Sequence, residues 1–437
     1  MAINWNTHPE SLARELRALQ INRFYFIYDP ATKKVIPSHP ELAEMAQALQ
    51  ADERDYAQHE GLFFQVSQNY DLIMSGNVHR TSRGQAAGGT RFWFYNRFED
   101  FVRDGMRLSK GMTYKNALAG LWWGGGKGVI SRPEGLDVRD PEVRKKIFQE
   151  YGSFITSLKG CYITAEDVGT NTTDIGSIFS KTRFVISIPE EVGGSGNPSA
   201  PTALGVVRGM EAAVEWKMKS SLEGKTIAIQ GLGNVGRPMV RYLLERNVGK
   251  IIACDINPEL VESMNQDFRE TAFTARAVDR NDSSILFEEC DVLAPCATGA
   301  ILNPNTIPEI KAPIICGAAN NQLEDSERDG PALLEKGVVY VPDYLVNRMG
   351  IVNCANEQYG YTPNDPYFNR HIGTEWENSV YQMTKKVLTQ AEENQCSPAK
   401  AADELAEKLS HEEHPLFGHR AQLIVQSLRD TGWEQSL

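Results

Sequence analysis

The chain has 437 residues, a length that suits two or three domains. Its hydrophobic content of 41% and charged content of 23% are typical of a globular protein with a sizeable core. The formal net charge of -12 disfavours nucleic-acid or membrane partners, because anionic partners select basic surfaces. The sequence has no signal peptide, no membrane-spanning apolar run and no C-x-x-C among its seven cysteines, so we expect a cytoplasmic protein with reduced thiols.

The first 200 residues predict an N-terminal α/β catalytic domain, in which residues 1–60 form an additional module. Strand-like runs alternate with helical runs after residue 60, and glycine-rich segments separate them. The predicted strands are 24–28, 63–66 and 162–164, the predicted helices are 99–120 and 141–158, and the glycine-rich turns are 84–89, 124–128 and 193–196.

From residue 201 the pattern changes to compact apolar runs between helical stretches, as parallel strands buried on both faces require. These predicted strands are residues 225–230, 250–254, 291–295, 312–316 and 337–341. We expect a second domain at 201–355 with a Rossmann dinucleotide-binding fold, separated from the first domain by a cleft. Residues 356–437 predict a helical tail that packs back on the first domain.

A dinucleotide-binding fingerprint opens the second domain. The first predicted strand leads directly into the sequence Gly-Leu-Gly-Asn-Val-Gly, and a helical segment follows. The glycines permit a tight turn and close approach of a pyrophosphate, and the helix N-terminus offers free N–H groups to it. A plain glycine turn between strand and helix is the alternative. The predicted cofactor contacts are Gly231, Leu232, Gly233, Asn234, Val235 and Gly236.

Asp255 makes this fingerprint more specific. It follows the second predicted strand, 19 residues after Gly236, where a carboxylate accepts hydrogen bonds from the hydroxyls of the adenosine ribose. Because a carboxylate there repels a 2′-phosphate, Asp255 favours NAD over NADP. The alternative is an ordinary turn residue at the end of a strand.

Two lysines in the first domain are candidates for chemistry. Lys127 lies in Gly124-Gly-Gly-Lys-Gly128, where the glycines let the backbone approach a ligand closely, and Lys115 ends Met112-Thr-Tyr-Lys115. Two lysines in one pocket lower each other's pKa, and burial lowers it further, which makes a lysine a base near neutral pH. The alternative for Lys127 is anion binding in a glycine turn, although the spacing is not that of a phosphate loop.

A carboxylate for proton transfer is predicted at Asp167, in Ala165-Glu-Asp-Val-Gly169 after a strand-like run. Glu166 competes with it, but neighbouring strand residues point to opposite faces, so we expect only one of them to serve. On its own Asp167 is equally suited to a turn or a helix cap. His411-Glu-Glu-His414 lacks the zinc-motif spacing and a third ligand, so we expect charged helix-end residues and no metal site.

Several longer motifs follow one another between about residues 75 and 360. They are MTYKNALAGL, GGGKGVI, YITAEDVGTN, GNPSAPTALGVVRGMEAA, IQGLGNVG, APCATGAILN, GAANNQL and VPDYLVN. This series resembles the glutamate/leucine/phenylalanine/valine dehydrogenase family, and within it the leucine, phenylalanine and tryptophan dehydrogenase branch. The resemblance implies a homo-oligomeric enzyme that reversibly deaminates an L-amino acid with NAD, yielding a 2-oxo acid, ammonium and NADH.

The resemblance also implies roles for matched residues. Lys115 resembles the lysine that binds the substrate carboxylate, Lys127 the catalytic lysine that activates water for attack on the imine, and Asp167 the acid/base at the amino nitrogen. The remaining matches are Gly88 and Gly89 at the substrate carboxylate, Thr202 at the nicotinamide amide, Cys296 and Ala297 near the adenosine half, and Asn320 at both substrate and nicotinamide ribose.

The pocket for the substrate side chain is predicted to be apolar. In the glutamate members a lysine just before the Gly-Gly pair binds the side-chain carboxylate, whereas this chain has Ala87. An unpaired buried carboxylate is strongly unfavourable, so we expect a branched aliphatic or aromatic substrate rather than glutamate. The predicted lining is Met112, Ala165, Ile351 and Cys354, for which plain core packing is the alternative.

Two short segments depart from the family pattern. Trp122 and Trp123 stand where relatives carry small or aliphatic residues, and Arg348-Met349 replaces the usual Ala-Gly. Arg348 is expected either to recognise a polar or acidic group or to face solvent. Two other functions stay open: an NAD-dependent oxidoreductase of a different small acid, and a non-catalytic NAD-binding homologue, which the presence of Lys127 and Asp167 disfavours.

Overall fold

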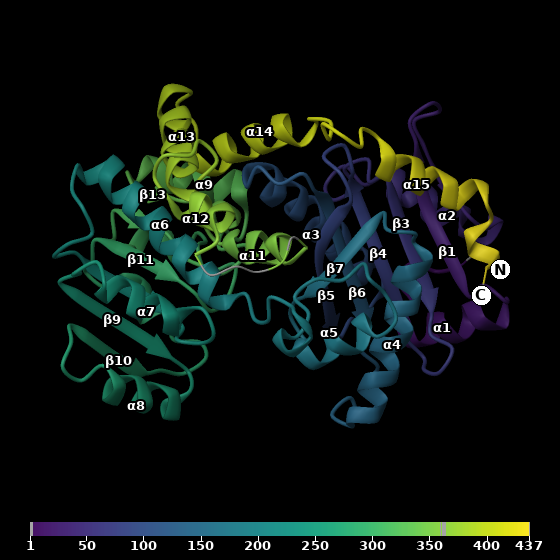
Figure 1. Cartoon of the computed structure of the whole chain (residues 1–437), viewed down its shortest axis with the longest axis horizontal. Helices are drawn as coiled ribbons and strands as arrows, with labels where there is room; N and C mark the ends of the chain where they lie inside the picture. Colours follow the sequence, from purple (N-terminus) through teal and green to yellow (C-terminus); the bar gives the residue numbers. More distant parts are fainter. Residues whose placement is uncertain (1–2, 359, 361–363, 437) are drawn as a thin grey trace.

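The computed structural model describes residues 3–358, 360 and 364–436 and contains two α/β bodies (Figure 1). A seven-stranded mixed sheet forms the centre of the first body, and a six-stranded parallel sheet forms the centre of the second. The predicted fold class, an N-terminal α/β body followed by a Rossmann body and a helical C-terminal tail, is confirmed.

The first sheet has the strand order β2-β1-β3-β4-β6-β5-β7. Strands β6, β5 and β7 run parallel to one another, and the remaining neighbours are antiparallel. The first 60 residues contribute two strands to this sheet. The strands are β1 (Arg23–Asp29), β2 (Lys34–Pro37), β3 (Gly61–Val66), β4 (Ile73–Arg80), β5 (Ala86–Trp93), β6 (Gly124–Ser131) and β7 (Tyr162–Glu166).

Helices cover this sheet and start at defined capping residues. Helix α3 packs on β4 and β6, and α4 packs on α5 and β7. The Asp140 carboxylate accepts hydrogen bonds from the first N–H groups of α4, and Asn171 and Asp174 form a reciprocal cap at the start of α5. The helices are α1 (Pro9–Ala18), η1 (Pro40–Leu42), α2 (Ala43–Gln50), α3 (Phe98–Leu118), α4 (Pro141–Ser157), α5 (Thr172–Phe179) and η2 (Glu190–Val192).

The prediction of glycine-rich turns at 84–89 and 124–128 was wrong over most of their length. Residues 86–93 are β5 and residues 124–131 are β6, in the interior of the sheet. A Cβ atom at Gly125 would overlap Thr113 of α3, and one at Gly128 would overlap Tyr151. The glycines therefore allow helices to pack tightly on the strands. Because this packing involves residues far away in the sequence, the local sequence lacks the β-branched residues that would predict a strand.

The second sheet has the order β10-β9-β8-β11-β12-β13, and all of its neighbouring strands are parallel. The order reverses between β8 and β11, and dinucleotides bind beyond the carboxyl ends of strands at such a point. The strands are β8 (Thr226–Gln230), β9 (Lys250–Asp255), β10 (Phe273–Ala277), β11 (Val292–Pro295), β12 (Ile314–Ile315) and β13 (Val339–Tyr340). The helices are α6 (Ser199–Met218), α7 (Gly236–Leu244), α8 (Pro258–Asp267), η3 (Ser284–Phe287), η4 (Ile307–Glu309) and α9 (Ser326–Glu335).

The C-terminal helices connect the two bodies, and in Figure 1 they cross from the second body to the first. Helix α13 packs on α6, α14 packs on α3, and η5 contacts β1. The elements are α10 (Asp343–Val346), α11 (Met349–Glu357), α12 (Pro366–Ile372), α13 (Val380–Glu393), α14 (Pro398–Ser410), α15 (Arg420–Asp430) and η5 (Trp433–Gln435). None of the helices in the described residues is both long and apolar enough to span a membrane.

Three histidines are buried and neutral. The Nε2 atom of His59 lies 3.0 Å from the main-chain oxygen of Met106, and its Nδ1 accepts a hydrogen bond from the N–H of Ala57. One donor and one acceptor suit the neutral ring. Burial lowers the pKa of His59 to about 4 and that of His371 to about 2, and it holds the pKa of His79 well below its usual value.

We expect the protein to lose stability as the pH falls below about 6.5, the ordinary pKa of histidine. The unfolded chain gains protons at these histidines from that pH downward, whereas folded His59 stays neutral until about pH 4, so acid favours unfolding. This difference amounts to roughly 3 kcal/mol for His59, at about 1.4 kcal/mol per pH unit.

Thermal unfolding between pH 8 and pH 5 measures this effect. The His59→Gln variant keeps a side-chain N–H donor for Met106 but does not titrate, so its Tm should fall less steeply with acidification than that of the wild type. A wild-type Tm that stays constant from pH 8 to pH 5 would contradict the prediction.

Candidate active site

Three charged residues meet on one face of the first sheet. Lys127 lies in β6, Arg91 lies in β5, and Asp167 directly follows β7, which are neighbouring parallel strands. The Nζ atom of Lys127 is 2.7 Å from Oδ2 of Asp167, and Nε of Arg91 is 3.5 Å from the same oxygen. Because Lys127 is only 4% exposed, the ion pair is shielded from bulk solvent.

The charges around Asp167 keep its carboxylate ionised. Burial raises its pKa, but the Lys127 ammonium and the Arg91 guanidinium outweigh burial, and the pKa lies below its usual range. Arg91 is held in turn by Asp104, since its Nη1 lies 3.0 Å from both carboxylate oxygens. Glu166 lies next to Thr172 instead, and burial raises its pKa.

A second ammonium approaches this pair from the last turn of α3. Burial lowers the pKa of Lys115 to about 8, with Asp343 raising it and Lys127 lowering it. Asp343 begins α10 and accepts hydrogen bonds from the N–H of Asn321 and the hydroxyl of Tyr340, both at 3.0 Å. The site therefore draws residues from both bodies.

Gly88 and Gly89 in β5 lie against this charged cluster. A Cβ atom at Gly88 would overlap the main-chain oxygen of Gly126 and press on Met112, and one at Gly89 would lie 2.8 Å from Cβ of Asp167. The carbonyl of Gly88 accepts a hydrogen bond from the hydroxyl of Tyr162 at 2.7 Å. Only glycine fits at these two positions, which leaves the backbone beside Lys127 and Asp167 without side chains.

The residues predicted to contact the substrate side chain belong to one apolar cluster. Ala87, Ala165, Ile351 and Cys354 are buried in it, and Met112 packs against it. The Sγ atom of Cys354 lies 2.9 Å from the hydroxyl oxygen of Ser187, and burial raises the pKa of the thiol to about 12. None of these side chains offers a positive charge to a carboxylate.

Arg348 fulfils neither of the two roles expected for it. Its side chain is fully buried and donates hydrogen bonds to the main-chain oxygens of Leu118 and Asn378. Burial lowers its pKa to about 9. The guanidinium links the end of α3 to the segment before α13, so it connects elements of the two bodies and neither faces solvent nor serves as a free cation in the pocket.

The fingerprint turn of the second body has the geometry that a dinucleotide requires. Gly231 has a φ of 94°, a left-handed conformation that favours glycine, and a Cβ atom at Gly236 would overlap the carbonyl oxygen of Gly231. The space around Gly233 is open within 4 Å, and no side chain caps the N-terminus of α7. The turn, completed by Leu232, Asn234 and Val235, therefore fits a pyrophosphate.

Most of the other predicted cofactor contacts end or follow strands of the second sheet, at the carboxyl ends of those strands. Asp255 ends β9, and its Oδ2 accepts a hydrogen bond from the N–H of Leu232 at 2.7 Å. Cys296 and Ala297 follow β11, and Ala297 packs against the fingerprint turn. Asn320 follows β12 and accepts a hydrogen bond from Asn347 at 2.8 Å. Thr202 lies in the first turn of α6, next to Gly350.

The motif His411-Glu-Glu-His414 is not arranged as a metal site. His411 pairs with Glu407, while the ring of His414 lies 5.7 Å from that of Trp122. No group of three or more His, Cys, Asp or Glu side chains among the described residues is placed to hold a metal ion. All seven cysteines lie in the described part of the chain and are free.

Comparison with known proteins identifies the family. Residues 193–414 match the model of the Glutamate/Leucine/Phenylalanine/Valine dehydrogenase family, and residues 75–184 match the Glu/Leu/Phe/Val dehydrogenase dimerisation domain. The chain is 45% identical to a leucine dehydrogenase of Geobacillus stearothermophilus over 334 residues, which cover 76% of this chain and 85% of the relative. The chain belongs to this family.

Further relatives agree with this assignment. An L-tryptophan dehydrogenase of Nostoc punctiforme is 36% identical over 80% of this chain and 92% of its own length. The crystal structure of L-tryptophan dehydrogenase from Nostoc punctiforme superposes with a TM-score of 0.67 at 34% identity, covering 84% of this chain and 98% of that one. The family resemblance is confirmed: the protein is an amino-acid dehydrogenase and uses a nicotinamide cofactor.

Two residues of this dehydrogenase site were missed from the sequence. Arg91 contacts Asp167, and Asp343 lies near Lys115. Arg91 stands in Gly88-Gly-Thr-Arg, and alternation puts it on the same face as Gly89 once β5 is recognised as a strand. Asp343 gave no such signal, since more than 200 residues separate it from Lys115 in the sequence.

Proposed function

We propose that this dehydrogenase catalyses the reversible, NAD-dependent oxidative deamination of an L-amino acid with a branched aliphatic or aromatic side chain. The products are the 2-oxo acid, ammonium and NADH. The Lys127–Asp167 ion pair, next to Lys115 and to an uncharged side-chain pocket, is the observation that carries this proposal. Relatives named leucine, tryptophan and valine dehydrogenase support the substrate class.

In the proposed mechanism Lys115 binds the substrate carboxylate through a charge-assisted hydrogen bond. A bound nicotinamide supplies the hydride acceptor for the α-carbon. Asp167, kept ionised by its neighbours, accepts a proton from the substrate nitrogen, so that the lone pair can form the imine. Lys127 accepts a proton from the water that attacks the imine carbon, and the resulting ammonium stabilises the negative charge that develops on the oxygen. Asp167 then returns its proton to the substrate nitrogen, the C–N bond breaks, and ammonium leaves the 2-oxo acid. Arg91 keeps Asp167 in position.

The residues of the second body fit the cofactor proposed for this reaction. Gly231 to Gly236 would hold the pyrophosphate, and Asp255 would receive the adenosine ribose. Thr202 and Asn320 would hold the nicotinamide end, and Cys296 and Ala297 would lie near the adenosine half. Each of these residues lies at the carboxyl ends of the parallel strands or at the start of α6, which supports the assignment.

A panel of L-amino acids with NAD tests the proposed function, with NADH formation and ammonium release measured in parallel. We expect equimolar NADH and ammonium with leucine, valine or phenylalanine. NADH formation without ammonium would indicate an oxidoreductase of a different small acid. The absence of turnover with all amino acids would contradict the proposed function.

The cofactor should be NAD rather than NADP. The Asp255 carboxylate stands at the fingerprint turn, 2.7 Å from the N–H of Leu232, where it would repel a 2′-phosphate. Removing one negative charge at a few ångströms is worth about 1 kcal/mol or more, so Asp255→Ser should lower the ratio of kcat/KM for NAD over NADP by roughly fivefold or more. The same change at Asp430, which is exposed at the end of α15 in the first body, is the matched control and should leave the ratio unaltered. Equal turnover of both cofactors by the wild type would refute the assignment.

We also propose that the enzyme forms a homo-oligomer in the cytoplasm. The match of residues 75–184 to a dimerisation domain supports self-association. The acidic composition supports a protein without nucleic-acid or membrane partners, whose ligands are an amino acid, its 2-oxo acid and ammonium.

A further inference from the structure

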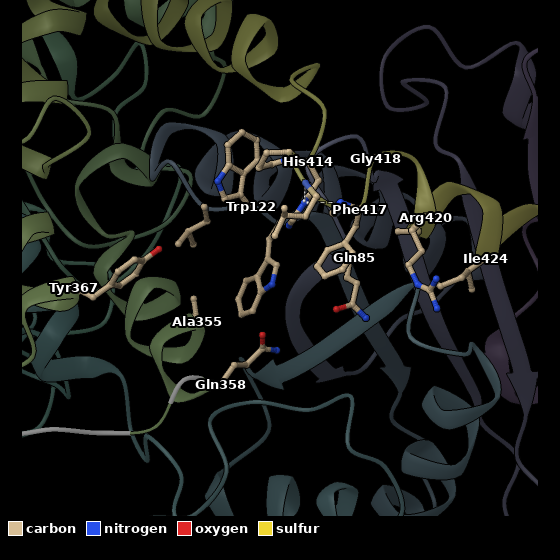
Figure 2. A pocket seen from close by; sticks show the side chains of 16 residues that line it. Gln85, Trp122, Ala355, Gln358, Tyr367, His414, Phe417, Gly418, Arg420 and Ile424 are labelled. Carbon is tan, nitrogen blue, oxygen red and sulfur yellow. Dashed lines mark hydrogen bonds between the residues drawn. The ribbon is translucent and has the colours of Figure 1, made fainter.

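A cavity of about 620 Å³ lies between the end of α11 and the C-terminal segment (Figure 2). Its lining comes from Gly84 and Gln85 just before β5, from residues 121–123 before β6, from the C-terminal end of α11 with α12, and from residues 414–424. Four aromatic residues contribute to it: Trp122, Trp123, Tyr367 and Phe417. Pockets that hold small molecules have volumes of about 300–1,000 Å³, so this cavity is large enough for one.

One face of α11 runs from the proposed side-chain pocket into the cavity. Ile351, Cys354, Ala355 and Gln358 follow the i, i+3, i+4, i+7 spacing that places residues on one side of a helix. Ile351 and Cys354 are the proposed substrate contacts, whereas Ala355 and Gln358 line the cavity. In Figure 2 these last two residues lie across the cavity from Phe417. The pocket and the cavity are therefore neighbours along this helix.

The first sheet contributes the second side of the boundary between the side-chain pocket and the cavity. Trp123 directly precedes β6, and alternation along the chain puts it on the same face as Gly125 and Lys127. Gly125 pairs with Ala87, the residue at the base of the proposed pocket. Trp123 is only 8% exposed and belongs to the apolar cluster that contains Ala87 and Cys354, yet it also lines the cavity.

We propose that Trp123 is the wall between the side-chain pocket and the cavity and thereby sets the largest side chain that the enzyme accepts. The proposal rests on the function proposed above. With the indole in place the pocket ends at Trp123, and leucine-sized side chains fit. An apolar cavity of about 150 Å³ already holds a benzene ring, so the adjoining space has ample room for an indole once the wall is removed.

Trp122 provides a matched control for Trp123. It also lines the cavity, but it is 41% exposed and lies outside the apolar cluster. The guanidinium carbon of Arg83 lies 4.3 Å from the centre of its ring. Trp122→Ala therefore enlarges the cavity without opening it to the side-chain pocket.

Part of the cavity lining comes from a segment outside the region that matches the family. The match ends at residue 414, whereas Phe417, Arg420 and Ile424 line the cavity. The C-terminal segment of this chain thus lines part of the space behind Trp123. Once Trp123 is removed, a larger side chain would extend from the side-chain pocket, which is made by the matched region, into the cavity, which residues after 414 help to line.

The test is kcat/KM for L-leucine and L-tryptophan with NAD in the wild type, Trp123→Ala and Trp122→Ala. Differences of one methylene in a pocket change kcat/KM by about 10–200-fold, so removing the indole should raise the tryptophan-to-leucine ratio at least tenfold. Trp122→Ala should leave the ratio unchanged. NADH binding and Tm verify that each variant is folded. An unchanged ratio in folded Trp123→Ala, or an equal rise in Trp122→Ala, would overturn the proposal.

A graded series covers the case in which Trp123→Ala does not fold. In Trp123→Phe and Trp123→Leu the ratio should increase with the volume removed, and a flat series in folded variants overturns the wall assignment. The two proposals fail differently. If the wild type deaminates no amino acid, the proposed function is wrong, whereas normal deamination of leucine with no response to any Trp123 variant refutes only the role of Trp123.

Discussion

Replacement of Lys127 by alanine is expected to lower kcat on the best substrate by about 10²–10⁴-fold, the usual loss for a positioned acid or base. The affinity for NADH should stay nearly unchanged. Lys127 Nζ lies 2.7 Å from Asp167 in the first body, while the fingerprint turn is in the second. Asp167→Asn should have a similar effect, because it removes the group that accepts the proton from nitrogen. Steady-state kinetics and NADH fluorescence titration measure both quantities.

Lys115→Ala is the informative comparison for this prediction. It should mainly raise KM, because it removes binding of the substrate carboxylate in the ground state. Burial lowers the pKa of Lys115 to about 8, and only its protonated form pairs with a carboxylate. In the wild type kcat/KM for the 2-oxo acid should therefore fall as the pH rises through about 8. In Lys115→Ala this fall at alkaline pH should be absent from the pH profile of kcat/KM.

Two outcomes would contradict the mechanism. Near-normal kcat in a folded Lys127→Ala variant would show that this lysine does not activate water. A loss of NADH affinity instead would favour the anion-binding alternative considered for the glycine-rich segment. The position of Lys127 inside β6, rather than in a turn before a helix, argues against a phosphate cradle.

The second large effect is discrimination against glutamate. We expect kcat/KM for leucine to exceed that for glutamate by about 10²–10⁴-fold, since a charge buried without its partner costs about 3–5 kcal/mol and 1.36 kcal/mol corresponds to tenfold. Ala87 is fully buried, and Ile351 and Cys354 add no charge. Competition between the two substrates at a fixed NAD concentration measures the ratio directly.

Ala87→Lys should partly reverse this preference by placing a cation at the base of the pocket. Ala87→Met, which is long but uncharged, is the matched control and should reduce turnover of leucine without improving glutamate. A wild-type enzyme that prefers glutamate would show that the pocket is assigned to the wrong residues.

The sequence by itself determined the Rossmann body and most of the candidate site, for a local reason. The turn from Gly231 to Gly236 lies between a strand and a helix within one short segment, and Asp255 follows at a fixed spacing. Lys115, Lys127 and Asp167 each stand in a motif whose residue types suit proton transfer. Strands buried on both faces are continuous apolar runs, so β8, β9 and β11 were visible in the composition alone.

Only the tertiary structure decided the features that depend on contacts between distant segments. Strands β5 and β6 could not be predicted from the sequence, because glycine has a low strand propensity. Their glycines are needed where α3 and α4 pack closely on the strands. Arg348 is buried because main-chain oxygens of Leu118 and Asn378 meet it there, which no local pattern records. Trp122 and Trp123 are identical and adjacent in sequence, yet only the second joins the apolar cluster. Burial is set by the whole fold, and spacing along the chain determines it only within a single helix or strand.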